Sequence, residues 1–327
     1  MNRASISQNR TMDRRSFLRL SSAVVASTAT RGSDNPTLDE AWYETSRRFA
    51  ALRMGRIAYV DRGSGSRVAL FLHGFPLNSF QWRGALERLS PYRRCIAPDL
   101  MGMGYSEISE DQELTPTAQV GMIASLLDSL KVSQVDVIAN DAGGIIAQLL
   151  TAAYPERVRT LLLSNCDVDT NNPPSLFHPA VALAKRGLFA ERYLMPQVKN
   201  KELARSVRGI GAQFTYPELL ADSTIDMYFD PLVSSPTRMR QVDRFTDALG
   251  DNVLVPMREK LSRWKKPARM VWAMQDNFFG AEWADWLDKT LTGSRGVRRL
   301  EGANLFFPEE MPDVIAQEAH SLWTAKR

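Results

Sequence analysis

Cysteine and histidine are scarce in this chain of 327 residues, which contains two cysteines and three histidines. Cys95 and Cys166 are far apart and lie in strand-like surroundings, so the sequence predicts buried free thiols rather than a disulfide framework. These few residues form no cluster with the spacing of metal ligands. We therefore expect neither a metal site nor a cofactor.

Excess charge and long apolar runs are also missing. The formal net charge is only +4, and part of it lies within residues 1–20, so nucleic acid is discounted as a partner. The apolar stretch from Leu20 to Ala29 is too short to span a bilayer, and no stable membrane insertion is expected. With 44% hydrophobic and 24% charged residues, the composition is that of an ordinary soluble globular protein of one or two domains. The oligomeric state stays open.

The N-terminus resembles a twin-arginine export signal. Asp13-Arg14-Arg15-Ser16-Phe17-Leu18-Arg19 precedes the mildly apolar stretch, which ends in small residues. We interpret residues 1–30 as a signal peptide, which predicts a periplasmic or extracellular protein. The alternative is a disordered basic tail. Residues 31–50 are polar and are predicted to be a linker.

Residues 135–146 join a β-branched apolar run to a helical pattern at a set of small residues. The spacing from Ala139 through Asp141 to Gly143 suits a nucleophile elbow, in which a strand bends sharply into a helix and the central residue is strained and exposed. Asp tolerates positive φ better than most residues, and the helix N-terminus would favour its negative charge. We interpret Asp141 as the reactive group. The alternative is a structural turn in which Asp141 only caps the helix.

Apolar strand patterns alternate with helical patterns along most of the chain, which predicts a doubly wound, mostly parallel α/β sheet. The expected strands are 57–61, 68–72, 94–97, the apolar run that opens residues 135–146, 159–163, 268–273 and 297–300. Residues 168–240 contain several short helical patterns without a strong strand, and they are predicted to be a helical insertion. The core then comprises residues 51–167 and 241–327.

Three landmarks follow one another along the chain: His73-Gly74-Phe75-Pro76, the Asp141 elbow, and Asp276 after a late strand. In this order they resemble the α/β-hydrolase superfamily, and within it the aspartate-nucleophile branch of haloalkane dehalogenases and epoxide hydrolases. The resemblance covers about residues 50–325. It implies that residues 168–240 form a cap over the pocket, and that the partner is a small, mostly apolar electrophile of the haloalkane or epoxide type.

The resemblance also implies a role for each landmark. Asp141 would attack an electrophilic carbon and form an alkyl-enzyme ester. The backbone N–H groups of Phe75 and Ala142 would form the oxyanion hole. Asp276 would orient a histidine, and that histidine would activate water to cleave the ester.

The chain departs from the family at this histidine. The matching segment is Gly302-Ala303-Asn304-Leu305, so Leu305 stands where the family has histidine. Of the three histidines, His73 belongs to the oxyanion loop, His178 to the predicted cap and His320 to the closing helix. Another base, such as Asp276 or His178, would have to act on water. Otherwise Asp141 is the base of a lyase or isomerase, or the chain is a weakened relative that only binds a ligand.

The substrate type depends on further positions. Haloalkane dehalogenases have Asn and Trp where this chain has Phe75 and Ala142, whereas Phe75 resembles epoxide hydrolases. Those enzymes use cap tyrosines as proton donors to the epoxide oxygen, and such tyrosines can also simply pack inside the cap. The residues expected at the substrate pocket are His73, Asn140, His178, Tyr193, Tyr216 and Tyr228.

Overall fold

The computed structural model of this protein describes residues 38–324. The predicted signal peptide, residues 1–30, lies outside the described residues. Among the described residues, no helix has the length and apolar character needed to cross a membrane.

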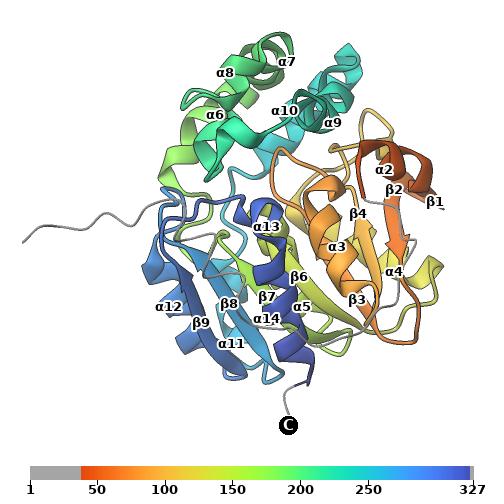
Figure 1. The fold of residues 1–327 in the computed structure, drawn as a ribbon, viewed down its shortest axis with the longest axis vertical. Helices are drawn as coiled ribbons and strands as arrows, with labels where there is room; N and C mark the ends of the chain where they lie inside the picture. The colour runs from red at the N-terminus through yellow and green to blue at the C-terminus, as the bar shows by residue number, and fades with distance from the viewer. Residues whose placement is uncertain (1–37, 325–327) are drawn as a thin grey trace, which may run out of the picture. The chain divides into compact units, whose positions relative to one another are not determined.

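One sheet forms the centre of the fold, with strand order β1-β2-β4-β3-β6-β7-β8-β9 and β5 paired to β2 (Figure 1). The strands are β1 (Arg48–Leu52), β2 (Gly55–Arg62), β3 (Val68–Leu72), β4 (Arg94–Pro98), β5 (Glu107–Ile108), β6 (Val135–Asn140), β7 (Val158–Ser164), β8 (Ala268–Ala273) and β9 (Ser294–Leu300). Strands β1, β2 and β5 pair antiparallel, whereas β4, β3, β6, β7, β8 and β9 pair parallel. The mostly parallel sheet predicted from the sequence is confirmed.

Strands β3 and β6 are buried along their whole length. Strand β3 is a continuous apolar run, as expected for a strand covered on both faces of a parallel sheet. In β6, the buried Asp136 carboxylate pairs with Arg159. Strand β6 lies between β3 and β7. The carboxyl ends of these three neighbours therefore meet at one edge of the sheet, which is where parallel α/β sheets place their sites.

Helices cover both faces of the sheet (Figure 1). Helix α5 (Ala142–Ala153) packs on β3, β6 and β7 and contacts α4 (Pro116–Ser129) and α11 (Arg258–Ser262). Helix α12 (Ala281–Thr290) continues this layer over β8 and β9. The other layer holds α3 (Arg83–Leu89), which follows η1 (Ser79–Trp82), and α13 (Phe307–Glu310) with α14 (Pro312–Thr324).

Part of the predicted linker is folded. Residues 38–50 contain α2 (Glu40–Ser46) and most of β1, which pairs with β2. The Asp39 carboxylate caps α2 by accepting a hydrogen bond from the Trp42 N–H at 2.8 Å. Tyr43 is buried in the core, and its hydroxyl donates to the Ser79 carbonyl at 2.7 Å. The linker prediction for residues 31–50 was therefore wrong from residue 38 onward, because one buried aromatic residue anchors an otherwise polar segment.

The insertion between β7 and β8 is helical, and Figure 1 shows α6 to α10 grouped together beside the core. Its segments before α11 are η2 (Ser175–Phe177), α6 (His178–Ala184), η3 (Ala190–Leu194), α7 (Met195–Lys199), α8 (Lys201–Arg205), η4 (Ile210–Gln213), η5 (Pro217–Leu219), α9 (Asp222–Val233), α10 (Pro236–Ala248) and η6 (Val255–Met257). The boundary predicted at residue 240 falls inside α10. It was placed too early because α10 continues the amphipathic pattern of the insertion without a break.

Candidate active site

The turn between β6 and α5 has the geometry of a nucleophile elbow. Asp141 has φ +52° and ψ −128°, so the positive φ expected from the sequence is present. Its N–H donates to the Asn165 carbonyl at 2.8 Å, and its carbonyl accepts from the Gly144 N–H at 2.7 Å. These backbone bonds hold Asp141 in a conformation that is uncommon for a residue with a side chain.

Gly143 allows the turn to be this tight. A Cβ at Gly143 would lie 2.3 Å from the Leu72 carbonyl oxygen. We expect Gly143→Ala to lower the free energy of unfolding by about 3 kcal/mol, because the clash is with backbone that must shift. Urea unfolding measures this loss. The control is Gly121→Ala in α4, where a Cβ meets nothing within 4 Å, and equal stability of the two variants would contradict the prediction.

The Asp141 side chain points away from its own helix and into a shared site. Its carboxylate makes no capping hydrogen bond to α5, so the structural-turn alternative is wrong. Instead, Oδ2 accepts from the Phe75 N–H at 2.6 Å. Gly74 permits this approach, since a Cβ there would lie 3.0 Å from Oδ2. The carboxylate thus binds one of the predicted oxyanion-hole donors.

Burial controls the charge of Asp141. It raises the pKa of the Asp141 carboxyl to about 6, and the nearby backbone N–H groups of Phe75 and Ala142 limit the rise. Asp141 is therefore a carboxylate above about pH 6, poorly hydrated and close to two N–H donors.

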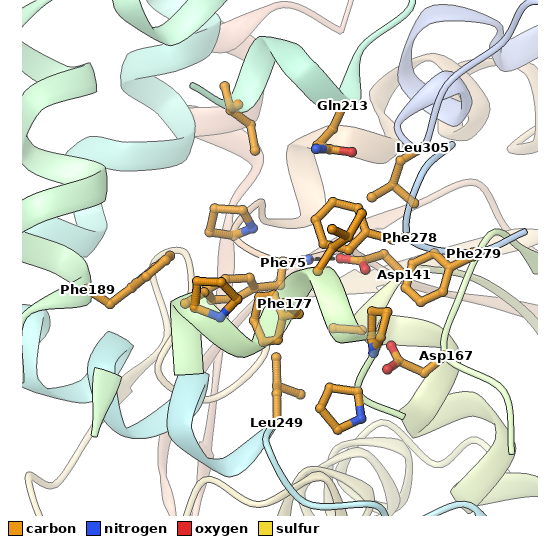
Figure 2. Close-up of a pocket in the computed structure, with 18 of the residues that line it drawn as sticks. Phe75, Asp141, Asp167, Phe177, Phe189, Gln213, Leu249, Phe278, Phe279 and Leu305 are labelled. Carbon is orange, nitrogen blue, oxygen red and sulfur yellow. Dashed lines mark hydrogen bonds between the residues drawn. The ribbon is translucent and has the colours of Figure 1, made fainter. Parts of the chain in front are cut away.

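Asp141 faces a cavity of about 280 Å³ between the core and the helical insertion. Figure 2 shows Asp141 beside Phe278 and Phe279, with Leu305 on the same side. Aromatic and aliphatic side chains make up most of the wall. The polar side chains of the wall are Asp141, Asp167, Tyr193 and Gln213. The cavity therefore suits a small, mostly apolar molecule.

Asp276 lies behind this wall rather than in it. It follows β8 and is buried, with Oδ2 accepting from Asn165 Nδ2 at 2.8 Å and Oδ1 accepting from the Phe278 N–H at 2.8 Å. Burial raises the pKa of Asp276 to about 7, and the nearby charge of Asp141 contributes to the rise. Asp276 is thus held in one orientation by Asn165 and the Phe278 N–H, and it does not line the cavity.

The raised pKa of Asp276 predicts a pH dependence of stability. Because the folded state binds the proton more tightly than the unfolded chain, this stabilisation is present below about pH 4 and is lost as the pH rises through about 7. The wild type should lose about 4 kcal/mol of its free energy of unfolding across this range through Asp276. In Asp276→Asn the loss should be smaller, as measured by urea unfolding from about pH 4 to about pH 8.

Asp313→Asn is the control for this titration. Arg88 lowers the pKa of the Asp313 carboxyl, so Asp313 titrates below the measured range. Its removal should leave the slope of stability against pH unchanged. If the free energy of unfolding of Asp276→Asn falls with pH as steeply as that of the wild type, the prediction is contradicted.

No histidine lines the cavity. Leu305 lines the cavity and is buried. His73 is buried elsewhere: its Nε2 accepts from the Leu100 N–H at 3.0 Å, so Nδ1 carries the hydrogen that is donated to the Gly74 carbonyl at 2.9 Å. His178 is exposed at the start of α6, and His320 is exposed on α14. The prediction that His73 and His178 line the pocket was wrong. His73 is bonded within the oxyanion loop and to Leu100, and His178 is exposed to solvent.

Asn140 is also a structural residue rather than a pocket residue. Its Oδ1 accepts from Gln81 Nε2 at 2.7 Å, and its Nδ2 donates to the Leu305 carbonyl at 3.2 Å. It is fully buried and absent from the cavity wall. Its hydrogen bonds hold the Leu305 loop against the end of β6.

The three predicted tyrosines lie in different places. Tyr193 lines the cavity and stacks on Phe189, with 5.2 Å between ring centroids. Tyr216 is exposed, and the Tyr228 hydroxyl donates to Glu309 at 2.6 Å outside the cavity. Tyr216 and Tyr228 were therefore wrong as pocket residues. Periodicity alone does not show which face of a short helix meets the core.

Asp167 is the site residue that sequence reasoning missed. It lines the cavity with Asp141 and is buried. Its position was visible as the last polar residue of Ser164-Asn165-Cys166-Asp167, directly after a buried strand. Polar residues at the carboxyl ends of neighbouring parallel strands converge at one edge of the sheet, and this signal could have found Asp167.

Comparisons with known proteins agree with this geometry. Residues 68–207 match the family described as the alpha/beta hydrolase fold. The chain is 37% identical over 102 residues to a haloalkane dehalogenase of Mesorhizobium japonicum, covering 31% of this chain and 33% of that protein. It is 25% identical over 289 residues to haloalkane dehalogenase 2 of Mycobacterium tuberculosis, covering 84% of this chain and 91% of that protein.

The fold is shared with solved structures. The structure of the epoxide hydrolase CorEH without ligand superimposes with a TM-score of 0.68 at 18% identity, covering 85% of this chain and 98% of that one. The first three curated relatives are each matched over only about a third of their own length. The sheet, the elbow and these matches together show that the chain has the α/β-hydrolase fold and is similar to haloalkane dehalogenases and epoxide hydrolases.

Proposed function

We propose that this protein is a hydrolase of small, mostly apolar electrophiles of the epoxide or haloalkane type, with Asp141 as the nucleophile. One observation carries the proposal: the Asp141 carboxylate is held at a strained elbow, faces an apolar cavity and accepts a hydrogen bond from Phe75 rather than capping its helix. A carboxylate with little water around it is a stronger nucleophile than a hydrated one.

The hydrogen bond from Phe75 assigns different roles to the two carboxylate oxygens. Oδ2 already accepts from the Phe75 N–H, so Oδ1 is the oxygen that attacks the substrate carbon. The bond from that carbon to its leaving oxygen or halide breaks, and an alkyl ester of Asp141 forms. Oδ2 is then the ester carbonyl oxygen. When water attacks the ester, negative charge develops on Oδ2, where the N–H groups of Phe75 and Ala142 stabilise it.

The helical insertion has the role of a cap in this proposal. Phe177, Leu183, Phe189 and Leu249 of the insertion form cavity wall opposite the elbow. They provide apolar contacts and exclude water from Asp141. Substrates should therefore be small and largely apolar, because the cavity is about 280 Å³ in volume.

A second candidate is a non-hydrolytic lyase or isomerase with Asp141 as a non-covalent base. The raised pKa of Asp141 and the absence of an imidazole from the cavity wall favour it. A base of this kind would exchange substrate hydrogen with deuterium from the solvent and would form no adduct. A covalent hydrolase would form an adduct with Asp141 and would not exchange substrate hydrogen with solvent deuterium.

Product analysis tests the proposed function. The full chain is incubated with a panel of small terminal epoxides and primary bromoalkanes, and diol, alcohol and bromide are measured. We expect diol or alcohol formation that requires the protein. No product from any substrate, together with deuterium exchange into a carbonyl compound, would favour the lyase or isomerase instead.

We also propose that the protein is exported by the twin-arginine route. The proposal rests on the sequence of residues 1–30 alone. Expression with and without Arg14→Lys/Arg15→Lys, followed by fractionation, tests it. Export that is unchanged in the variant would contradict it.

A further inference from the structure

Asp167 is a second carboxyl group in the cavity of Asp141, and none of the family landmarks assigns it a role. It lies three residues after the end of β7, the strand that pairs with the elbow strand β6. Both carboxyl groups belong to the cavity wall, and both are buried. Figure 2 shows Asp167 below Asp141 on the same side of the cavity.

The surrounding residues hold Asp167 in one orientation. Its Oδ1 accepts from Asn172 Nδ2 at 3.1 Å. The Asn172 amide is itself fixed, because its Oδ1 accepts from the Val253 N–H at 2.9 Å. The Asp167 carbonyl accepts from Gln148 Nε2 at 2.8 Å. The carboxyl group is therefore positioned by a buried network rather than mobile in the cavity.

One oxygen of Asp167 is available to a ligand. Among residues 38–324, no other residue donates a side-chain hydrogen bond to Oδ2 of Asp167. A carboxyl group of the cavity wall with only one oxygen anchored by an amide can deliver or accept a proton in the cavity.

Burial acts on the protonation of both carboxyl groups. Burial and the nearby charge of Asp141 raise the pKa of Asp167 well above its usual value. Burial raises the pKa of Asp141 only to about 6, because two backbone N–H groups stabilise its carboxylate. The rise at Asp167 favours a protonated carboxyl group there beside the Asp141 carboxylate, which is the pairing that a nucleophile and a proton donor need.

We propose that Asp167 is the general acid and then the general base of an epoxide-hydrolase cycle in which Asp141 is the nucleophile. This inference rests on the proposed function and narrows its substrate to an epoxide. Asp167 would take over the task of the missing imidazole at Leu305 and the proton-donor task predicted for cap tyrosines.

The cycle consists of ester formation and ester hydrolysis. Asp141 Oδ1 attacks an epoxide carbon, the ring C–O bond breaks, and the epoxide oxygen takes the proton of Asp167. An ester of Asp141 and a free hydroxyl group result, and Asp167 is now a carboxylate. It accepts a proton from water as the water oxygen attacks the ester carbonyl carbon. The ester C–O bond then breaks, and the departing oxygen takes the second proton of the attacking water, so that a diol leaves. Asp141 is a carboxylate again, and Asp167 is protonated.

The leaving group explains why this arrangement favours epoxides. An epoxide oxygen becomes an alkoxide unless it receives a proton, whereas a halide leaves without one. Tyr193 and Gln213 are the other polar side chains of the cavity wall. None of the four polar side chains of the wall carries a positive charge that would attract a departing halide.

The test separates the acid role from the base role in single-turnover experiments on Asp167→Asn. Asn keeps an oxygen that can accept from Asn172, so the network of hydrogen bonds is preserved. With a terminal epoxide, ester formation should slow on the order of 10²-fold or more, because the proton donor is missing. With a primary bromoalkane, ester formation should keep its wild-type rate, and the ester should then persist. Rapid quench and intact-protein mass spectrometry measure both steps.

Asp313→Asn is the matched control, since it makes the same change in an exposed carboxyl group outside the cavity wall. It should leave both steps near their wild-type rates. Tyr193→Phe removes the other hydroxyl group of the wall that could donate a proton. If Asp167→Asn opens the epoxide at the wild-type rate, or if Tyr193→Phe shows the loss instead, the proposal is overturned. Loss of the bromoalkane step in Asp167→Asn would also overturn it, because the defect would then lie in the site as a whole. A wild type that forms no ester with either substrate would instead refute the proposed function.

Discussion

Asp141→Asn is expected to lose turnover of every substrate, with kcat reduced on the order of 10⁴-fold or more. The amide oxygen of Asn is a far weaker nucleophile than a carboxylate, so no ester forms. The fold should be kept, because Asn retains an oxygen that can accept from the Phe75 N–H. Steady-state kinetics with the best epoxide of the panel measures the loss.

The stability of Asp141→Asn provides an internal check. Burial raises the pKa of the Asp141 carboxyl to about 6, so the ionised group destabilises the folded protein above that pH. The variant should therefore be at least as stable as the wild type at about pH 8. A well-folded variant that keeps more than about one-hundredth of the wild-type kcat would contradict the nucleophile role.

Leu305→His is expected to restore a general base at the place where the family has one. Leu305 lines the cavity, and its loop lies beside the Asp276 loop, since the Gln275 N–H donates to the Ala303 carbonyl at 2.9 Å. An imidazole there would have Asp276 nearby to orient it. In the Asp167→Asn background, Leu305→His should speed ester hydrolysis on the order of 10²-fold or more.

The measurement starts from the Asp141 ester that the Asp167→Asn variant forms with a primary bromoalkane. Its decay is followed by mass spectrometry with and without Leu305→His. Leu305→Gln is the matched control, because it adds a polar side chain of similar length without a base. Equal rates of ester decay in the Leu305→His and Leu305→Gln variants would show that the absence of histidine at residue 305 does not limit hydrolysis.

The core of the fold could be predicted because its determinants are local. Val68–Leu72 is a continuous apolar run, and only a strand covered on both faces buries such a run completely. The elbow was likewise visible, since Gly143 and Asp141 meet steric demands of the turn itself. These parts of the structure depend on neighbours in the sequence.

The parts that escaped prediction depend on contacts between distant residues. Tyr43 joins the core through Ser79, which no pattern within residues 31–50 reveals. The Tyr228 hydroxyl donates to Glu309, 81 residues away, and not to the cavity. Asp167 enters the site only because β7 pairs with β6 and Asn172 orients its carboxyl group. Sequence reasoning located the reactive edge of the sheet but not the full set of side chains that meet there.

Oxygen exchange in Asp141 tests the central claim most directly. In a single turnover in heavy-oxygen water, an ester mechanism places heavy oxygen in the Asp141 carboxylate, because water attacks the ester carbonyl carbon. The new oxygen of the product then comes from Asp141 and is light. We predict a heavier peptide containing Asp141 and an unlabelled product. Heavy oxygen in the product with an unchanged Asp141 peptide would mean that water attacks the substrate directly, and it would contradict the account.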